Sequence, residues 1–387
     1  MRALSDTLMR MTAFREAGAA IGSRAGSDRL SELTGFGGNP GALRALTYVP
    51  PGLPKGAPLV VVLHGCTQSA AEYDLGSGWS AMADAAGFAV LFPEQARANN
   101  FNLCFNWFEP GDVRRGKGEA ASIRQMIEAM IGQHGLDRGR VYITGLSAGG
   151  AMASVMLATY PEVFAGGAVI AGLPYGVAAS VPEAFDAMRG HGGPGEAALP
   201  GKVRKASPHK GPWPSISVWH GSADHTVSPS NGEALLSQWR GVHDLDPDPT
   251  HTEVAAGHTR RVWRDAQGRA LLEHNLVAGM GHGVPLDPDG SAGGGVSGAY
   301  MLDVGVASTR DIAASWGLIH EVEATVAPRP VQTPRAVTAP PPAQAPRAVS
   351  SPLPPPRKPA HAAPALPKVS AIGAVIEDAL RQAGLMK

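Results

Sequence analysis

The feature that most constrains this chain is a Gly-x-Ser-x-Gly motif at residues 145–149. It stands between residues 141–144, which have the β-branched and aromatic character of a short buried strand, and residues 151–158, whose small and unbranched apolar residues favour a helix. A strand that turns directly into a helix needs glycine on both sides of the serine, because a Cβ there would meet neighbouring backbone. The turn strains the serine and presents Ser147 Oγ beside the N-terminal amides of the helix. The motif therefore predicts a nucleophilic serine.

A serine nucleophile needs a base within hydrogen-bond reach and an acid that orients the base. In this architecture the three residues follow the chain order Ser, Asp or Glu, His. Asp224 follows the apolar strand 215–219 in the turn HGSADHTV, and His282 follows strand 270–277 in the loop AGMGHG. Both positions lie beyond the carboxyl ends of strands, where catalytic groups of open α/β sheets collect. We therefore expect Ser147, Asp224 and His282 to form a catalytic triad.

Four other residues are alternatives for the acid and the base. Asp265 and Asp287 are alternatives for the acid, but neither follows a strand of that kind. His225 adjoins Asp224 and is expected to point away from it, and His274 lies inside a predicted strand.

The oxyanion formed during acyl transfer needs two N–H donors, each typically worth about 3–4 kcal/mol of barrier. One expected donor is the backbone N–H of Ala148, directly after the nucleophile. The other is expected from the turn His64-Gly65-Cys66, which follows the continuous apolar strand 59–63, and we favour the N–H of Cys66. His64 is interpreted as a clamp for this turn.

The rest of the chain alternates between strand and helix patterns and predicts an α/β fold with a mostly parallel, doubly wound sheet. Expected strands are residues 43–49, 59–63, 88–92, 141–144, 165–171, 215–219, 259–264 and 270–277. Expected helices are residues 78–86, 119–133, 151–158, 232–240 and 307–316. Residues 176–212 hold one expected helix at residues 182–188, followed by glycines and prolines, and are interpreted as an insertion above the sheet.

Four regions are expected along the chain: an N-terminal helix and linker (1–40), a catalytic domain (41–320), a proline-rich linker (321–368) and an amphipathic helix (369–387). Residues 328–367 contain 14 prolines and no acidic residue, a composition that cannot build a core. The last region places Ile372, Val375, Ile376, Ala379 and Leu380 on one stripe. Because a helix this short is marginal alone, its stripe needs a partner surface: its own catalytic domain, another protein or an apolar granule.

Composition excludes some partners. The formal net charge is +0, which does not indicate nucleic acid binding, and no apolar run is long enough to span a membrane. Residues 1–20 carry arginines and acids without the apolar core of a secretory signal. We therefore expect a cytoplasmic protein, or a secreted one if a leader is missing.

The two cysteines, Cys66 and Cys104, have no metal-binding spacing. They are either two buried thiols or one bridge. A bridge would stabilise the fold by about 4 kcal/mol on the chain-entropy model and would attach the oxyanion turn to the segment CFNWF. It would, however, be unusual in the cytoplasm.

Five motifs occur in order at residues 63–283: LHGCTQS, CFNWF, GLSAGGAM, WHGSADHTV and GMGHG. Together they resemble the poly(3-hydroxybutyrate) depolymerase family of esterases, which is related to feruloyl and acetylxylan esterases. The resemblance covers roughly residues 40–320. It implies an α/β-hydrolase fold and a serine esterase, with Ser147 as nucleophile, Asp224 as acid, His282 as base and Cys66 at the oxyanion position. It also implies that Cys66 and Cys104 are positions that are paired in secreted members.

Three functions follow from these observations. The first is a serine esterase that hydrolyses polyhydroxybutyrate or its oligomers without a metal or an organic cofactor. The second is a feruloyl, acetylxylan or other small-ester esterase, and the third is a catalytically dead scaffold that acts as a binding protein. Trp107, Tyr175 and Trp219 are candidates for an acyl cleft, and core packing is the alternative for each.

Overall fold

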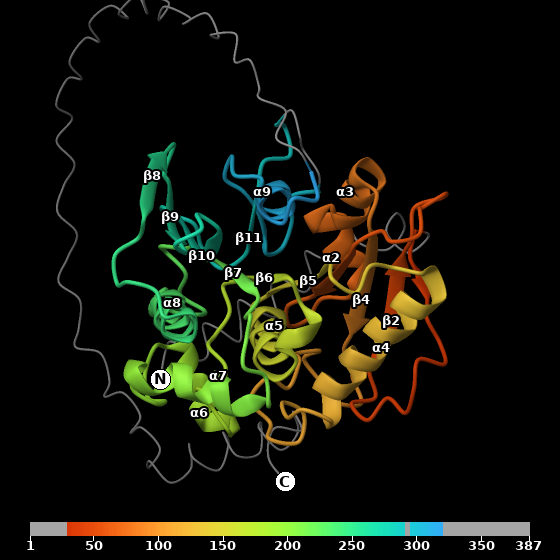
Figure 1. The fold of residues 1–387 in the computed structure, drawn as a ribbon, viewed down its shortest axis with the longest axis horizontal. Helices are drawn as coiled ribbons and strands as arrows, with labels where there is room; N and C mark the ends of the chain where they lie inside the picture. The colour runs from red at the N-terminus through yellow and green to blue at the C-terminus, as the bar shows by residue number, and fades with distance from the viewer. Residues whose placement is uncertain (1–28, 291–294, 320–387) are drawn as a thin grey trace, which may run out of the picture. The chain divides into compact units, whose positions relative to one another are not determined.

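The computed structural model describes residues 29–290 and 295–319, and a ten-stranded sheet lies at its centre (Figure 1). In spatial order the strands are β1 (Ser31–Glu32), β2 (Arg44–Tyr48), β4 (Ala89–Glu94), β3 (Leu59–Leu63), β5 (Val141–Leu146), β6 (Gly166–Ile170), β7 (Ser215–Gly221), β10 (Ala270–Val277), β9 (His258–Arg264) and β8 (His251–Ala255). The strands from β4 through β10 run parallel, and antiparallel pairs close both edges. The mostly parallel sheet predicted from the sequence is confirmed.

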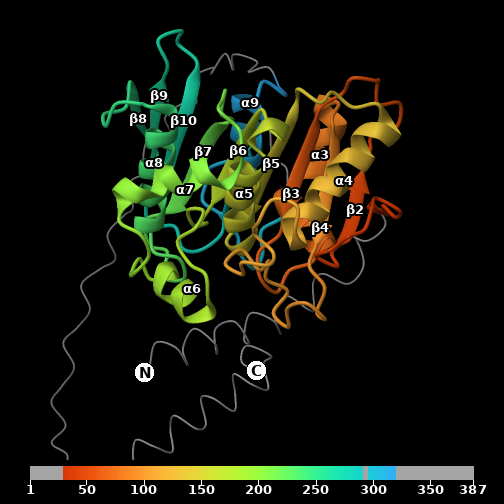
Figure 2. The same ribbon diagram turned by 60° about the horizontal axis from the view of Figure 1, so that its bottom comes forward.

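Helices lie on both faces of this sheet (Figures 1 and 2). They are α2 (Ala70–Ser77), α3 (Trp79–Ala86), α4 (Gly118–His134), α5 (Ala148–Thr159), α6 (Val181–Met188), α7 (Leu199–Ala206), α8 (Ser230–His243) and α9 (Ser308–Ser315), with short 3₁₀ turns at Pro161–Val163 and Glu196–Ala198. A second small sheet pairs β11 (Val284–Leu286) with β12 (Met301–Asp303) in parallel. In Figure 1, α3 and α9 lie above the sheet, and α4, α5 and α8 lie below it.

Two apolar cores follow from the alternation of side chains along each strand. In β3, Leu59, Val61 and Leu63 belong to the core under α4, α5 and α8. Val60 and Val62 point the other way, into the core shared with α3 and α9. Because all five residues are buried, β3 is a continuous apolar run, as expected of a central strand covered on both faces.

Several elements differ from the sequence expectation, α2, β8 and α7 among them. α2 was not expected; a capping box between Ser69 and Glu72 begins it, and Gly78 in the left-handed conformation separates it from α3. β8 was not expected either, because its residues are exposed and show no apolar alternation.

The interpretation of residues 176–212 as an insertion above the sheet is wrong for α7. This helix buries Leu199 and Val203, which are one turn apart, and packs against α8 and α5 in the helical layer.

Some predictions fall outside the described residues: the N-terminal helix, most of the first linker, the proline-rich linker and the C-terminal amphipathic helix. Among the helices of the described ranges, none is long and apolar enough to cross a membrane.

Candidate active site

Ser147 occupies the tight turn between β5 and α5, with backbone angles φ 57° and ψ −118°. A residue with a side chain rarely adopts such angles, and strain of this kind costs about 1–3 kcal/mol. Backbone hydrogen bonds hold it: the Ser147 N–H donates to Ile170 O at 2.9 Å, and the Ala151 N–H donates to Ser147 O at 2.8 Å.

Glycine is required on both sides of this serine, as the motif predicts. A Cβ on Gly145 would lie 2.5 Å from the carbonyl of Gly149. A Cβ on Gly149 would lie 2.4 Å from the carbonyl oxygens of Leu63 and His64. The absence of a Cβ at Gly149 therefore allows the start of α5 to approach the end of β3 closely.

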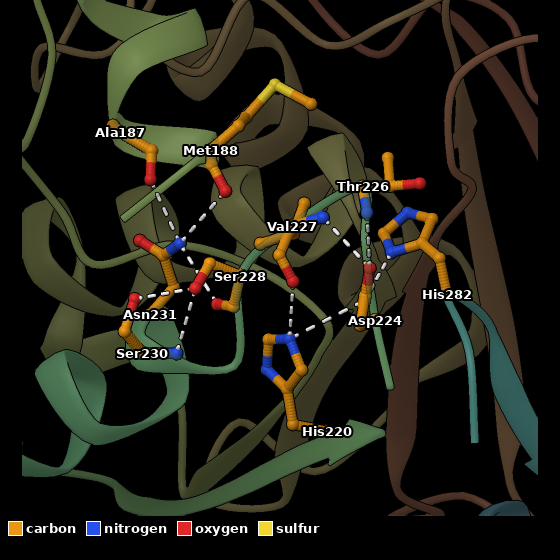
Figure 3. Close-up of polar contacts among 10 residues, drawn as sticks. All are labelled: Ala187, Met188, His220, Asp224, Thr226, Val227, Ser228, Ser230, Asn231 and His282. Carbon is orange, nitrogen blue, oxygen red and sulfur yellow. Dashed lines mark hydrogen bonds and ion pairs between the residues drawn. The ribbon is translucent and has the colours of Figure 1, made fainter. Parts of the chain in front are cut away.

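Asp224 and His282 are brought together by the ends of β7 and β10, which are neighbours in the sheet (Figure 3). His282 Nδ1 lies 2.7 Å from Asp224 Oδ2. Oδ1 of the same carboxylate accepts hydrogen bonds from the N–H groups of Thr226 and Val227 at 2.8 and 2.9 Å. The carboxylate is therefore fixed on one oxygen by the backbone and faces the imidazole with the other.

The charge of this carboxylate is stabilised inside the protein. Burial by itself raises the pKa of Asp224, but donors from His220, His282 and the Val227 backbone outweigh it and hold the pKa below its ordinary value. A buried, ionised Asp224 is suited to orient His282 and to stabilise its protonated form.

Gly221 allows the loop of His282 to approach β7. A Cβ on Gly221 would lie 2.2 Å from Met280 O and 2.6 Å from Gly281 O. The Ala223 N–H donates to Met280 O at 3.0 Å and joins the two loops. His282 also makes an edge-on ring contact with Tyr300, with ring centroids 6.0 Å apart.

The two expected oxyanion donors have no acceptor within the described part of the chain. In the turn after β3, the N–H groups of Gly65, Thr67 and Gln68 bond to Gln68 Oε1, Asn102 O and Gly65 O, respectively. For the N–H of Cys66, no partner exists among residues 29–290 and 295–319. The same holds for Ala148, the first residue of α5, where a helix leaves its amides unbonded.

A disulfide joins Cys66 to Cys104, with an S–S distance of 2.08 Å. Of the two alternatives for the cysteines, the structure therefore has the bridge. It connects the turn of Cys66 with the segment that follows β4.

His64 clamps the same turn, in agreement with its sequence interpretation. Its Nε2 accepts from the Gln95 N–H at 3.1 Å, so Nδ1 carries the proton and donates to Gly65 O at 2.8 Å. Burial lowers the pKa of His64, which suits this neutral form.

Behind the turn lies a buried carboxyl group, Glu119. Its two oxygens accept from Gln95 Nε2 at 2.5 Å and from the Asn106 N–H at 2.9 Å, and the Gln95 side chain also donates to Cys104 O. Burial, with a smaller contribution from Asp112, raises the pKa of Glu119 to about 8. This network supports the turn of His64 and Cys66 from inside the protein.

Two of the four alternatives for acid and base have other roles. Asp265 caps a turn and pairs with Arg269. His274 is buried in β10, accepts from Arg261 at 2.7 Å and has its pKa lowered to about 3 by burial.

Of the three candidates for the acyl cleft, the prediction for Trp219 is wrong. It is 2% exposed, belongs to the core on the α3 and α9 face, donates to Ser217 Oγ and stacks on His258. Trp107 is buried in the opposite core and Tyr175 is half-buried against it, and the acyl-cleft role of both stays a prediction.

His220, Tyr300 and Glu119 were not predicted to belong to the site. His220 could have been found, because it stands four residues before Asp224 in the same turn motif. Among the described residues, no group of three or more His, Cys, Asp or Glu side chains could hold a metal ion.

Comparison with known proteins gives consistent matches. The family model described as esterase PHB depolymerase matches residues 43–263. The chain is 47% identical over 296 residues to poly(3-hydroxyalkanoate) depolymerase C of Paucimonas lemoignei, covering 75% of this chain and 70% of that protein. It is 31% identical over 267 residues to feruloyl esterase B of Talaromyces stipitatus, covering 67% and 73%, respectively. Among solved structures, an acetyl xylan esterase from Aspergillus awamori matches with a TM-score of 0.63 and 25% identity, over 75% of this chain and 99% of that one.

Proposed function

The chain belongs to the esterase PHB depolymerase family and is a carboxylic ester hydrolase of the α/β-hydrolase type, and from this premise we propose that it hydrolyses polyhydroxybutyrate or its oligomers through an acyl-enzyme on Ser147. The observation that carries the assignment of roles is the 2.7 Å contact between His282 Nδ1 and Asp224 Oδ2, at the same sheet edge as the strained Ser147.

In the proposed acylation step, Ser147 Oγ attacks the ester carbonyl carbon and His282 Nε2 takes the hydroxyl proton. Because Nδ1 of His282 donates to Asp224, Nε2 is free to act as the base. The carbonyl oxygen becomes an oxyanion and accepts from the N–H groups of Cys66 and Ala148. When the tetrahedral intermediate collapses, the ester C–O bond breaks and the proton on His282 passes to the leaving alcohol.

Deacylation repeats these steps with water as the nucleophile. His282 takes a proton from water, the hydroxide attacks the acyl carbon, and the same two N–H groups accept the second oxyanion. Collapse returns the proton to Ser147 Oγ and releases a carboxylic acid. This sequence needs only side chains and backbone of the chain itself.

The substrate class is supported by the 47% identity with a poly(3-hydroxyalkanoate) depolymerase. A feruloyl or acetylxylan type of ester is the second candidate, favoured by the relatives with those names and by the acetyl xylan esterase structure that matches at a TM-score of 0.63.

The experiment that tests both candidates compares wild type and Ser147→Ala on short p-nitrophenyl esters, amorphous polyhydroxybutyrate, acetylated xylan and methyl ferulate. We expect wild type to cleave the p-nitrophenyl esters and the polyester, and the variant to cleave neither. Cleavage of p-nitrophenyl esters and xylan acetate without polyester would replace the first candidate by the second. Normal hydrolysis by Ser147→Ala would end the assignment of the nucleophile, and hydrolysis by neither protein would favour a binding scaffold.

We further propose that the protein works in an oxidising compartment. The disulfide between Cys66 and Cys104 favours the secreted alternative over the cytoplasmic expectation, because such bonds are rarely maintained in a reducing cytosol. The sequence of residues 369–387 adds the proposal that the tail binds an apolar granule or a protein partner. Granule binding by a chain that lacks residues 325–387, compared with the full chain, tests it.

A further inference from the structure

A second histidine lies against the acid of the proposed triad. His220 is fully buried at the end of β7, and its Nε2 lies 3.0 Å from Val227 O and 3.5 Å from Asp224 Oδ2 (Figure 3). Since Val227 O can only accept, Nε2 of His220 carries a proton and donates it. The proton points toward the carbonyl and, over a longer distance, toward the same carboxylate oxygen that faces His282.

The other nitrogen of the ring supports this orientation. His220 Nδ1 is buried and has no hydrogen-bond partner within the described residues. A Cβ on Gly232, in the first turn of α8, would lie 3.3 Å from it. The positive end of the α8 dipole therefore lies on the side of Nδ1 and favours its unprotonated lone pair, which leaves the proton on Nε2.

The contact with Val227 O closes a turn that holds Asp224 from both sides. The Val227 N–H donates to Asp224 Oδ1, while the Val227 carbonyl accepts from His220. The turn is also fixed from outside, since the Ser228 N–H donates to Met188 O at 2.7 Å and Asn231 Nδ2 donates to Ala187 O at 3.0 Å, both at the end of α6 (Figure 3). Without the His220 donor, the Val227 carbonyl loses this hydrogen bond and Asp224 Oδ2 loses its contact with Nε2.

We propose that His220 is a positioning residue of the ester hydrolase reaction, which acts through Asp224 by holding its carboxylate in the orientation that accepts the His282 N–H. The inference rests on the proposed function, because it requires Asp224 to be the acid. His220 itself does not contact substrate in this role.

The proposal has an electrostatic consequence that a packing role would not have. His220 and the orientation of Oδ2 together set how strongly Asp224 attracts the imidazolium of His282, so the loss of the His220 donor changes that attraction. The acid limb of the kcat/KM profile should then move away from its wild-type position. The other titratable or charged groups around these residues are Tyr300 against His282 and, beyond Gly232, His274 with Arg261.

The test compares His220→Leu, which removes the donor at similar volume, with His220→Gln, whose side-chain amide nitrogen can stand where Nε2 stood. For His220→Leu we expect kcat on a p-nitrophenyl ester to fall about tenfold, because the hydrogen bond to Val227 O and the 3.5 Å contact with Asp224 Oδ2 are both lost, with KM within about twofold. The acid limb should shift by a few tenths of a pH unit or more, and His220→Gln should restore most of both.

His243→Leu is the matched control. His243 is a half-buried histidine whose Nε2 also contacts a backbone carbonyl, Pro214 O at 3.1 Å, but it lies at the other end of α8. Its replacement should lower stability without moving kcat or the pH profile.

A double-mutant cycle separates positioning from general damage. In an Asp224→Asn background, His220→Leu should cause little further loss, because the group through which it acts is already altered. The same tenfold loss in both backgrounds, or an unmoved pH profile in His220→Leu, would overturn the proposal. If Ser147→Ala or Asp224→Asn retained activity, the proposed function would fail instead, so the two failures are distinguishable.

Discussion

Gly149→Ala is the perturbation that the structure constrains most tightly. The new methyl carbon would lie 2.4 Å from two carbonyl oxygens, those of Leu63 and His64. Ordinary contacts of this kind begin at about 3.4 Å, and since both partners are backbone, the end of β3 and the start of α5 must separate by roughly 0.6–1 Å.

This separation acts directly on the proposed oxyanion site. The N–H of Ala148 belongs to α5, whereas the N–H of Cys66 belongs to the turn after β3. A catalytic donor must lie about 2.7–3.1 Å from the oxyanion, so a relative shift of this size moves at least one donor out of range. The loss of one donor corresponds to about 3–4 kcal/mol of barrier, or about 100-fold to 1000-fold in kcat. Overpacking should also reduce stability by about 1–3 kcal/mol.

The assay is steady-state hydrolysis of a p-nitrophenyl ester together with urea unfolding. We expect kcat to fall by at least about 100-fold with KM nearly unchanged, because the donors act on the transition state. Gly132→Ala in α4 is the control, since a Cβ there meets nothing within 4 Å; it should leave kcat unchanged and stabilise the helix by about 0.5–1 kcal/mol. A Gly149→Ala enzyme with kcat within threefold of wild type would refute the oxyanion assignment or the packing argument.

Three further predictions follow. Cys66→Ser with Cys104→Ser should reduce the free energy of unfolding by about 4 kcal/mol, because the bridge spans a sequence separation of 38 residues; a urea midpoint equal to wild type would contradict this. Asp224→Asn should lower kcat by about 10⁴-fold with the fold intact, measured by ester hydrolysis and circular dichroism, and a loss below tenfold would remove Asp224 from the triad. Glu119 has its pKa raised from 4.5 to about 8 in the folded chain, so its contribution to stability is complete below about pH 4.5 and is lost as the pH rises through 8; the full loss is at most about 5 kcal/mol. Unfolding measured from pH 5 to 9 should show this decline in wild type and lack it in Glu119→Gln, and parallel curves for the two proteins would argue against it.

The residues around Ser147 could be predicted because local chemistry determines them. The glycines at 145 and 149 are required by the turn itself, and Asp224 and His282 follow apolar strands whose parallel order places their ends at one edge. Each of these inferences uses only short stretches of sequence and one topological rule.

The residues that the sequence did not predict correctly depend on contacts that form only in the folded chain. Glu119 supports the turn of His64 and Cys66 through Gln95, a contact between distant residues that no local pattern contains. Trp219 was a candidate for the cleft, but side chains alternate along β7, so that Val218 enters one core and Trp219 the other. The sequence shows His220 only as part of a turn motif. The distance between its Nε2 and Asp224 Oδ2 is what distinguishes it from a packing residue.

The position of β10 in the sheet determines when the sheet can close as the chain is synthesised. β10 is made after β8 and β9, yet it lies between β7 and β9 and pairs with both. A nascent chain that has left the ribosome only as far as β9 cannot attach that hairpin to the rest of the sheet. The strand that joins the two parts also leads directly to His282. We therefore expect folding intermediates that lack β10 to have an open sheet edge and no hydrolytic activity, so that closure of the sheet and the onset of catalysis coincide.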